Sequence, residues 1–89
     1  MNISPYIDHT ILKPDSTAQA VDIVCAEAMQ FGFASVCIQP WHVGRAAAIL
    51  RDSPVAVCTV VGFPLGATTT KTKTAETIDA IERGAREID

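Results

Sequence analysis

Asp8 and Thr10 are the first side chains along the chain whose types and spacing suit chemistry. They lie two residues apart in the apolar segment 7–12, which has the composition of a short strand. Because side chains alternate between the two faces of a strand, the carboxylate and the hydroxyl point to the same face. Burying both without a polar partner costs free energy. Residue chemistry alone leaves two interpretations open: the polar face of an exposed edge strand, or a pair that lines a site.

Two possible nucleophiles come later in the chain. Lys13 follows the first apolar segment, and a buried lysine of lowered pKa can form a Schiff base. Pro14 and Asp15 come directly after it, and a lysine beside an aspartate in a turn is normally solvated. Cys37 lies near the end of a second apolar segment, where a thiol can face a site. The alternative for Cys37 is a buried, inert thiol.

The spacing of the histidines and cysteines predicts no metal site. The cysteines are odd in number and stand in apolar contexts: Cys25, Cys37 and Cys58. We expect them to be reduced and buried. His9 has the opposite parity to the carboxylate–hydroxyl pair, and we expect a hydrogen-bonded structural role for it. His42, beside Trp41, is interpreted as a helix-entry or interface residue, and neither histidine has metal-ligand spacing to a cysteine.

The most strongly apolar segment spans residues 55–61 and ends in Gly62-Phe63-Pro64-Leu65-Gly66. A continuous apolar run without alternation is typical of a strand buried on both faces of a parallel sheet. The glycines after it match neither a dinucleotide-binding fingerprint nor a Walker sequence. The strands predicted from composition lie near residues 7–12, 34–38 and 55–61, with a stump at 87–89.

Helical periodicity fills the segments between these strands. Ser16 and Gln19 fit a capping box at the start of the first helix, and Gly32 is placed to end it. Thr70 or Thr72 is expected to cap the third helix. The predicted apolar faces are Val21, Val24, Cys25 and Ala28 for the first helix, Val43, Ala46, Ala47 and Leu50 for the second, and Ala75, Ile78, Ile81 and Ala85 for the third.

The alternation of strands and helices predicts an α/β fold with right-handed crossovers and a parallel sheet. An open doubly wound sheet and an eight-stranded barrel both use this alternation. A barrel needs about 250 residues, whereas this chain has 89. The chain therefore holds about three and a half βα units, taken as one domain over residues 1–89.

Charge and hydropathy exclude several partner classes. The net charge of −3 provides no attraction to nucleic acid or to an acidic membrane surface. No run of 18 apolar residues could span a membrane, and the first residues do not form a signal peptide. We expect a cytoplasmic protein that binds neither nucleic acid nor membrane.

Four motifs together resemble the deoxyribose-phosphate aldolase family. They are Ile7-Asp8-His9-Thr10-Ile11-Leu12-Lys13-Pro14, Ser35-Val36-Cys37-Ile38-Gln39-Pro40, Val61-Gly62-Phe63-Pro64-Leu65-Gly66-Ala67 and Glu87-Ile88-Asp89. The resemblance covers the whole chain. It implies a class I aldolase of the TIM (β/α)8 barrel fold that cleaves 2-deoxy-D-ribose 5-phosphate reversibly to D-glyceraldehyde 3-phosphate and acetaldehyde, through a lysine Schiff base and with no metal or other cofactor.

The resemblance also implies roles for particular residues. The family's proton-transferring aspartate on the fourth strand matches Asp89, although residue chemistry alone indicates only a frayed, solvated terminal residue. The residues that line the family's site match Asp8, Thr10 and Cys37. The Schiff-base lysine, a second essential lysine and the phosphate site belong to later strands and loops that this chain does not contain. We therefore expect a truncated N-terminal portion that is inactive alone.

Two readings from other functional classes accompany this one. The first is a structural half-barrel that self-associates, because strands cut from a closed barrel leave unpaired edges and exposed apolar side chains. It predicts a homo-oligomer formed through the strand edges. The second is a small flavodoxin-like binding module, which requires a glycine-containing phosphate loop after the first strand; residues 13–16 supply no glycine.

Overall fold

The computed structural model describes residues 3–13, 16–63 and 69–89. Within them, a parallel sheet has the strand order β1-β2-β3-β4. The strands are β1 (Asp8–Ile11), β2 (Ser35–Ile38), β3 (Ala56–Thr59) and β4 (Glu87–Ile88). The helices are α1 (Ala18–Phe31), α2 (Val43–Ile49) and α3 (Thr70–Glu82), with short 3-10 helices η1 (Ser4–Tyr6) and η2 (Pro40–His42). Each strand lies within the range expected from the sequence. Of the four motifs, Pro14 and residues 64–67 lie outside the described residues, and so does Asp15.

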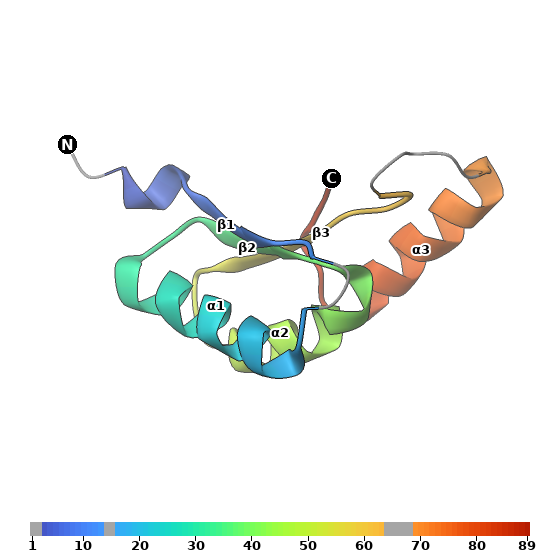
Figure 1. The fold of residues 1–89 in the computed structure, drawn as a ribbon. Helices are drawn as coiled ribbons and strands as arrows, with labels where there is room; N and C mark the ends of the chain where they lie inside the picture. Colours follow the sequence, from blue (N-terminus) through green and yellow to red (C-terminus); the bar gives the residue numbers. More distant parts are fainter. Residues whose placement is uncertain (1–2, 14–15, 64–68) are drawn as a thin grey trace.

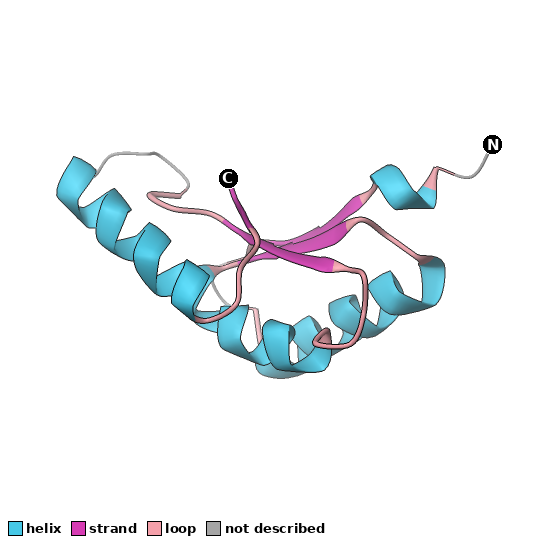
Figure 2. Ribbon diagram, turned by 180° about the vertical axis from the view of Figure 1, so that it is seen from behind, coloured by secondary structure: helices cyan, strands magenta, loops and turns pink. Residues whose placement is uncertain are grey.

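The sheet is covered on one face. Figure 1 shows α1 and α2 together beneath the strands, while α3 runs outward from the end of the sheet. The reverse view in Figure 2 shows the same two layers, with no helix of the described residues across the opposite face. We call that opposite face the open face. A parallel sheet with helices between successive strands is the architecture that the sequence predicts.

The core lies between the sheet and α1 and α2. Val36 and Ile38 of β2 and Val57 of β3 are at most 3% exposed and face the helices. The predicted buried face of α1 is confirmed. In α2, Val43, Ala46 and Leu50 are buried and Ala47 packs against them. The core members contributed by these two helices and the turn after α2 are Val21, Val24, Cys25, Ala28, Val43, Ala46 and Leu50.

The helix ends correct two predictions. The N-cap of α1 is Thr17, whose side chain accepts a hydrogen bond from the Ala20 N–H at 3.1 Å, so the capping box at Ser16 is wrong. The Ser16 side chain is buried instead and lies beside His42. Gly32 ends α1 with φ of 68°, as predicted. For α3, the cap is Thr69 rather than Thr70 or Thr72, because its hydroxyl accepts from the Thr72 N–H.

The apolar face predicted for α3 is also wrong. Ile78 and Ile81 are 53% and 57% exposed, and Ala75 is exposed too, whereas Ala80 is the buried residue of the helix. Ala85, just after the helix, is buried as expected. The reason is the position of α3, which reaches the core only near its C-terminal end (Figure 1). Helical spacing identifies an apolar face but does not supply the surface that covers it.

In the described part of the chain, the helices fall short of the length and apolar character needed to cross a membrane.

Gly84 is a position where a side chain should be costly. Its φ is +114°, and an added Cβ would lie 2.7 Å from the Cβ of Ala47. We expect Gly84→Ala to lower the free energy of unfolding by about 1–3 kcal/mol, measured by urea denaturation followed by circular dichroism. Gly44→Ala is the matched control, because Gly44 lies within α2 with nothing within 4 Å. That change should raise stability by roughly 0.5–1 kcal/mol. Equal stability of the two variants would contradict the inference that a side chain at position 84 is destabilising.

Candidate functional site

One row of side chains crosses the open face from edge to edge. Thr10 is the register partner of Cys37, Cys37 of Cys58, and Cys58 of Glu87. Register partners in a sheet share a face, and residues two apart along a strand do as well. Cys37, Cys58 and Val60 form a small apolar cluster with Leu12, separate from the core under the helices. The open face therefore has an apolar, thiol-containing floor.

Asp8 lies on the same face as Thr10, two residues earlier at the start of β1. Its register partner, Ser35, donates a hydrogen bond from Oγ to Asp8 Oδ1 at 2.6 Å. The Thr10 hydroxyl donates to the Asp8 carbonyl oxygen at 3.2 Å. Ser35 is fully buried, so this hydrogen bond ties the Asp8 carboxylate to a side chain of the sheet interior. Asp8 and Thr10 are exposed on β1, an edge strand among the described residues, so the edge-strand alternative fits this geometry too.

Asp89 reaches the same face from the other edge of the sheet. Its N–H donates to the Thr59 carbonyl at 2.7 Å, and its own carbonyl accepts from the Val61 N–H at 3.3 Å. These two bonds place Asp89 opposite Val60 and hold its main chain against β3. Because Asp89 is two residues after Glu87, it continues the open-face row. Its side chain is exposed.

The two thiols of the floor are held in their neutral form. Burial raises the pKa of Cys37, although contact with the Cys58 thiol acts in the opposite direction, and the charges of Asp89, Asp8 and Glu87 raise it further. Burial, the Cys37 thiol and the carboxylates of Glu87 and Asp89 raise the pKa of Cys58 to about 12. A thiol of raised pKa is a poor nucleophile at neutral pH. Burial and the raised pKa therefore favour the alternative in which Cys37 is a buried thiol that does not act as a nucleophile at neutral pH.

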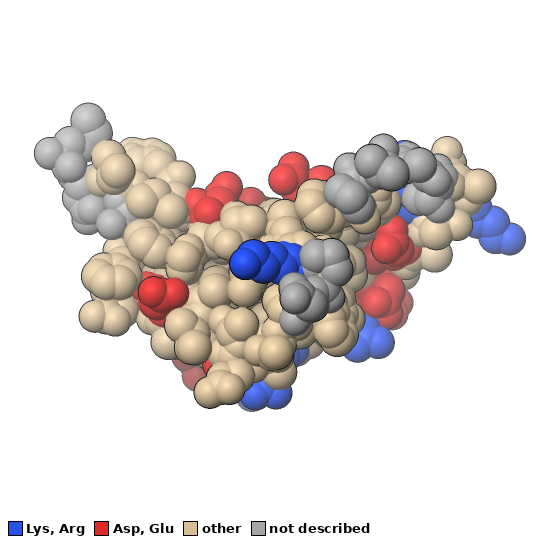
Figure 3. Space-filling model, viewed as in Figure 1, with Lys and Arg blue, Asp and Glu red and all other residues tan. Residues whose placement is uncertain are grey.

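The charge on the open face is negative. Asp8, Glu87 and Asp89 are the exposed carboxylates on it. Figure 3 shows acidic atoms on the upper side of the molecule, the side away from α1 and α2, while basic atoms lie at its front and along its lower and outer parts. No group of three or more His, Cys, Asp and Glu side chains among residues 3–13, 16–63 and 69–89 is arranged to hold a metal ion.

Three polar contacts position the segments at the carboxyl ends of the strands. The Gln39 side-chain amide donates to the Leu12 carbonyl at 2.8 Å and joins the segments after β1 and β2. His42, buried next to Ser16, has its Nε2 3.2 Å from the Ser16 carbonyl. Glu76 of α3 accepts a hydrogen bond from the Gly62 N–H at 2.9 Å. Sequence reasoning missed these contacts and Ser35–Asp8, because their partners lie 14 to 27 residues apart.

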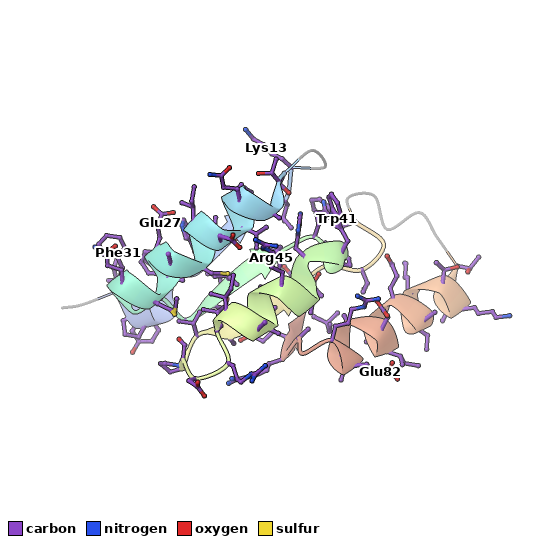
Figure 4. All side chains as sticks on the ribbon, turned by 90° about the horizontal axis from the view of Figure 1, so that it is seen from below. Lys13, Glu27, Phe31, Trp41, Arg45 and Glu82 are labelled. Atoms are coloured by element: carbon purple, nitrogen blue, oxygen red, sulfur yellow. The ribbon has the colours of Figure 1, made fainter. Side chains whose placement is uncertain are left out.

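The other candidates lie away from the open face. His9 packs on the helical side, with Nε2 3.1 Å from Glu27 and its ring edge-on to Phe33, which agrees with a structural role. Lys13 is exposed, and Figure 4 shows it pointing outward at the periphery. Arg45 lies between α1 and α2 in the same view and forms two hydrogen bonds with Asp22. Structure and sequence thus agree that Lys13 is not part of a site with Asp8 and Thr10.

Comparison with known proteins relates this chain to one family. No protein-family model matches it. Over all 89 residues it is 58% identical to deoxyribose-phosphate aldolase of Staphylococcus haemolyticus and 55% identical to that of Brevibacillus brevis. Over its whole length the chain is similar to proteins named deoxyribose-phosphate aldolase. It spans about 40% of the length of these two relatives.

A solved structure extends the relation to the fold. The deoxyribose phosphate aldolase of Aeropyrum pernix, described as a tetramer, superposes with a TM-score of 0.92 at 31% sequence identity. The match covers 98% of this chain and 37% of that one. The parallel βα units described here therefore match part of that aldolase, and the predicted fold class, about three and a half βα units of a TIM barrel, is confirmed. In such a barrel the open face corresponds to the interior.

The raised thiol pKa values predict slow alkylation of the folded chain. Cys58 has a pKa of about 12 and Cys25, in α1, one of about 11, against an ordinary value of 9.0. At pH 7.5 we expect iodoacetamide to label both at least roughly 100-fold more slowly than in denaturant, with the rate rising about tenfold per pH unit. Peptide mass spectrometry after quenching measures each site.

The Gly44→Ala variant distinguishes alkylation of the folded chain from alkylation that occurs through unfolding. The variant is expected to be more stable, so it slows labelling that proceeds through the unfolded chain and leaves native-state labelling unchanged. Equal rates for folded and denatured Cys58 at pH 7.5 would contradict the raised pKa.

Proposed function

We propose that this chain supplies the first four strands of a barrel that cleaves 2-deoxy-D-ribose 5-phosphate reversibly to D-glyceraldehyde 3-phosphate and acetaldehyde. The match of the whole chain to proteins named deoxyribose-phosphate aldolase carries the proposal. The proposed reaction is that of a class I aldolase. A lysine amine condenses with the sugar carbonyl and releases water, and the resulting imine accepts the electron pair of the breaking carbon–carbon bond. We propose that no metal or other cofactor takes part.

Asp89 is the proposed proton donor and acceptor of this reaction. Retro-aldol cleavage requires a proton to leave a substrate hydroxyl and another to reach the enamine carbon, and a positioned carboxylate can carry both. Asp89 fits this role because it is exposed on the open face and its main chain is held on β3 by two hydrogen bonds. Its position beyond the thiol floor leaves its carboxylate accessible to a substrate above the sheet.

Asp8, Thr10 and Cys37 are the proposed lining residues. Ser35 orients the Asp8 carboxylate, and Thr10 offers a hydroxyl two residues further along the same strand. Cys37 lies between Thr10 and Cys58 in the row across the sheet and contributes neutral, compact surface to the floor. Carboxylate and hydroxyl groups above an apolar floor suit a small polyhydroxylated substrate.

The 89-residue chain alone is proposed to be inactive. The lysines of the chain are Lys13, Lys71 and Lys73. Lys13 is exposed after β1, and the other two lie in the first turn and a half of α3. None belongs to a strand of the open face, so we propose that no lysine of this chain forms the imine beside Asp89. We propose that the missing lysine and the phosphate site belong to later strands and loops of a longer barrel.

Complementation tests the proposal directly. The 89-residue chain is combined with the C-terminal remainder of the Staphylococcus haemolyticus relative, beginning where the match ends. We expect aldolase activity from the mixture but from neither part alone, because the carboxylate and the lysine come from different polypeptides. Asp89→Asn should lower the restored activity by at least about 100-fold. Asp52→Asn, an exposed aspartate after α2, should leave it unchanged.

Borohydride trapping supplies the control for the isolated chain. With acetaldehyde or deoxyribose phosphate as the carbonyl compound, we expect labelling in the complemented mixture and none in the 89-residue chain alone. A labelled isolated chain, or full activity with Asp89→Asn, would overturn the proposal.

A second candidate function is a self-associating half-barrel, which the exposed surfaces favour. β1 and β4 are edge strands of the described sheet, and its open face has no helix over it. We propose that copies of the chain pair through these strand edges. Unpaired edges and uncovered apolar side chains are the usual causes of such pairing.

Light scattering over a concentration series measures the self-association. We expect a dimer or a larger species, because the outer edges of β1 and β4 have no partner strand among residues 3–13, 16–63 and 69–89. Ile81→Lys places a charge on the exposed face of α3 and should leave the assembly intact if the edges carry it. Loss of assembly in this variant would assign it to α3, and a stable monomer at all concentrations would exclude the candidate.

A further inference from the structure

Cys37 and Cys58 form a pair of thiols that the aldolase reaction does not use together. They are register partners on the neighbouring strands β2 and β3 and belong to the same cluster on the open face. Both are free thiols, 5% and 7% exposed. The register pairing places the two side chains side by side on one face, and each thiol affects the pKa of the other.

The backbone already satisfies the main geometric requirement of a disulfide. Neighbouring strands lie about 4.8 Å apart, and the Cα atoms of disulfide-bonded cysteines are usually about 4.4–6.8 Å apart. The two side chains share a face, so neither strand has to turn over to bring the sulfurs together. We propose that Cys37 and Cys58 are a dithiol modification site at which a hydroperoxide closes a disulfide between β2 and β3.

The reaction balances without any group beyond the peroxide. One thiolate attacks a peroxide oxygen, which gives a sulfenic acid and releases water from hydrogen peroxide. The second thiol attacks the sulfenic sulfur, the S–S bond forms, and a second water leaves. The two cysteines together lose two hydrogen atoms and two electrons, and the peroxide is reduced to two molecules of water. The chain becomes lighter by about 2 Da.

The surroundings of the pair set the rate and the reversibility of this step. The titratable and charged groups that face the pair are Asp8 on β1 and Glu87 and Asp89 at β4. They and burial keep the thiols protonated, so oxidation is slow at neutral pH and accelerates as the pH rises. The strand spacing lies near the short end of the disulfide range, so a dithiol reductant should reopen the bond readily.

The third cysteine provides a matched control within the same chain. Cys25 lies in α1, on the helical side of the sheet, and is fully buried. Its pKa is raised to about 11, in the same direction as that of Cys58, but it lies in a helix and takes no part in the strand register that pairs Cys37 with Cys58. A difference in behaviour between Cys25 and the pair therefore reports on proximity rather than on burial or acidity.

Oxidation with hydrogen peroxide, followed by peptide mass spectrometry, tests the site. The folded chain is oxidised, the remaining thiols are alkylated in denaturant, and cleavage after Glu27, Arg45 and Arg51 separates the three cysteines. We expect a linked Cys37–Cys58 peptide pair, an alkylated Cys25 and recovery of all three thiols after dithiothreitol. Cys25→Ala should form the same bond, and both Cys37→Ala and Cys58→Ala should lose it while keeping the helical circular dichroism signal.

Several results would overturn the proposal. They are sulfinic acid at a single cysteine, a disulfide that includes Cys25, disulfides only between chains, or no reaction under conditions that oxidise the denatured chain. The mass readout does not depend on catalysis, so failure of the aldolase proposal leaves it intact. The effect on activity does rest on the proposed function: in the complemented mixture, oxidation should lower the rate and dithiothreitol should restore it.

Discussion

Burial of one face of the sheet beneath α1 and α2 is the interaction on which the remaining structure depends. A fully buried valine, leucine or isoleucine contributes about 1.5–3 kcal/mol, and Val36, Ile38, Val43 and Leu50 are all of this kind. The exposed Asp22–Arg45 pair that joins the same helices contributes only about 0–1 kcal/mol. Apolar burial, rather than ion pairing, therefore holds the two layers together.

This one-sided core also determines the composition of the open face. A slip of one residue along a strand would turn its buried side chains toward the other face, so the core holds the register. With Val36 and Ile38 held beneath the sheet, Ser35 and Cys37 must face the other way. Carboxylates at the two edges of the open face stay exposed and solvated, whereas the thiols between them are buried and neutral. The difference between the two faces follows from the period of two along each strand.

Periodicity accounts for the parts of the fold that could be predicted. The continuous apolar run before Gly62 identified β3, and the helical spacing identified the buried face of α1, because both patterns depend only on neighbours in the chain. The helix caps were less predictable, because adjacent hydroxyl residues such as Ser16 and Thr17 are equally able to accept the capping hydrogen bond from a backbone N–H of the first turn. The prediction of the buried face of α3 was wrong for a different reason. Exposure depends on what packs against a helix, and Ile78 remains 53% exposed within the described residues.

The amino-acid sequence by itself determined the element order, the parity that places Asp8 and Thr10 on one face and, through the four motifs, the resemblance to deoxyribose-phosphate aldolases. These features are local or are carried by the order of residues. Only the tertiary structure decided that Cys37 meets Cys58 and that Ser35 holds Asp8, because strand register brings together residues 21 and 27 positions apart. It likewise placed Asp89 on the open face through its main-chain bonds to β3. Contacts between distant residues depend on how the layers pack, which no local pattern encodes.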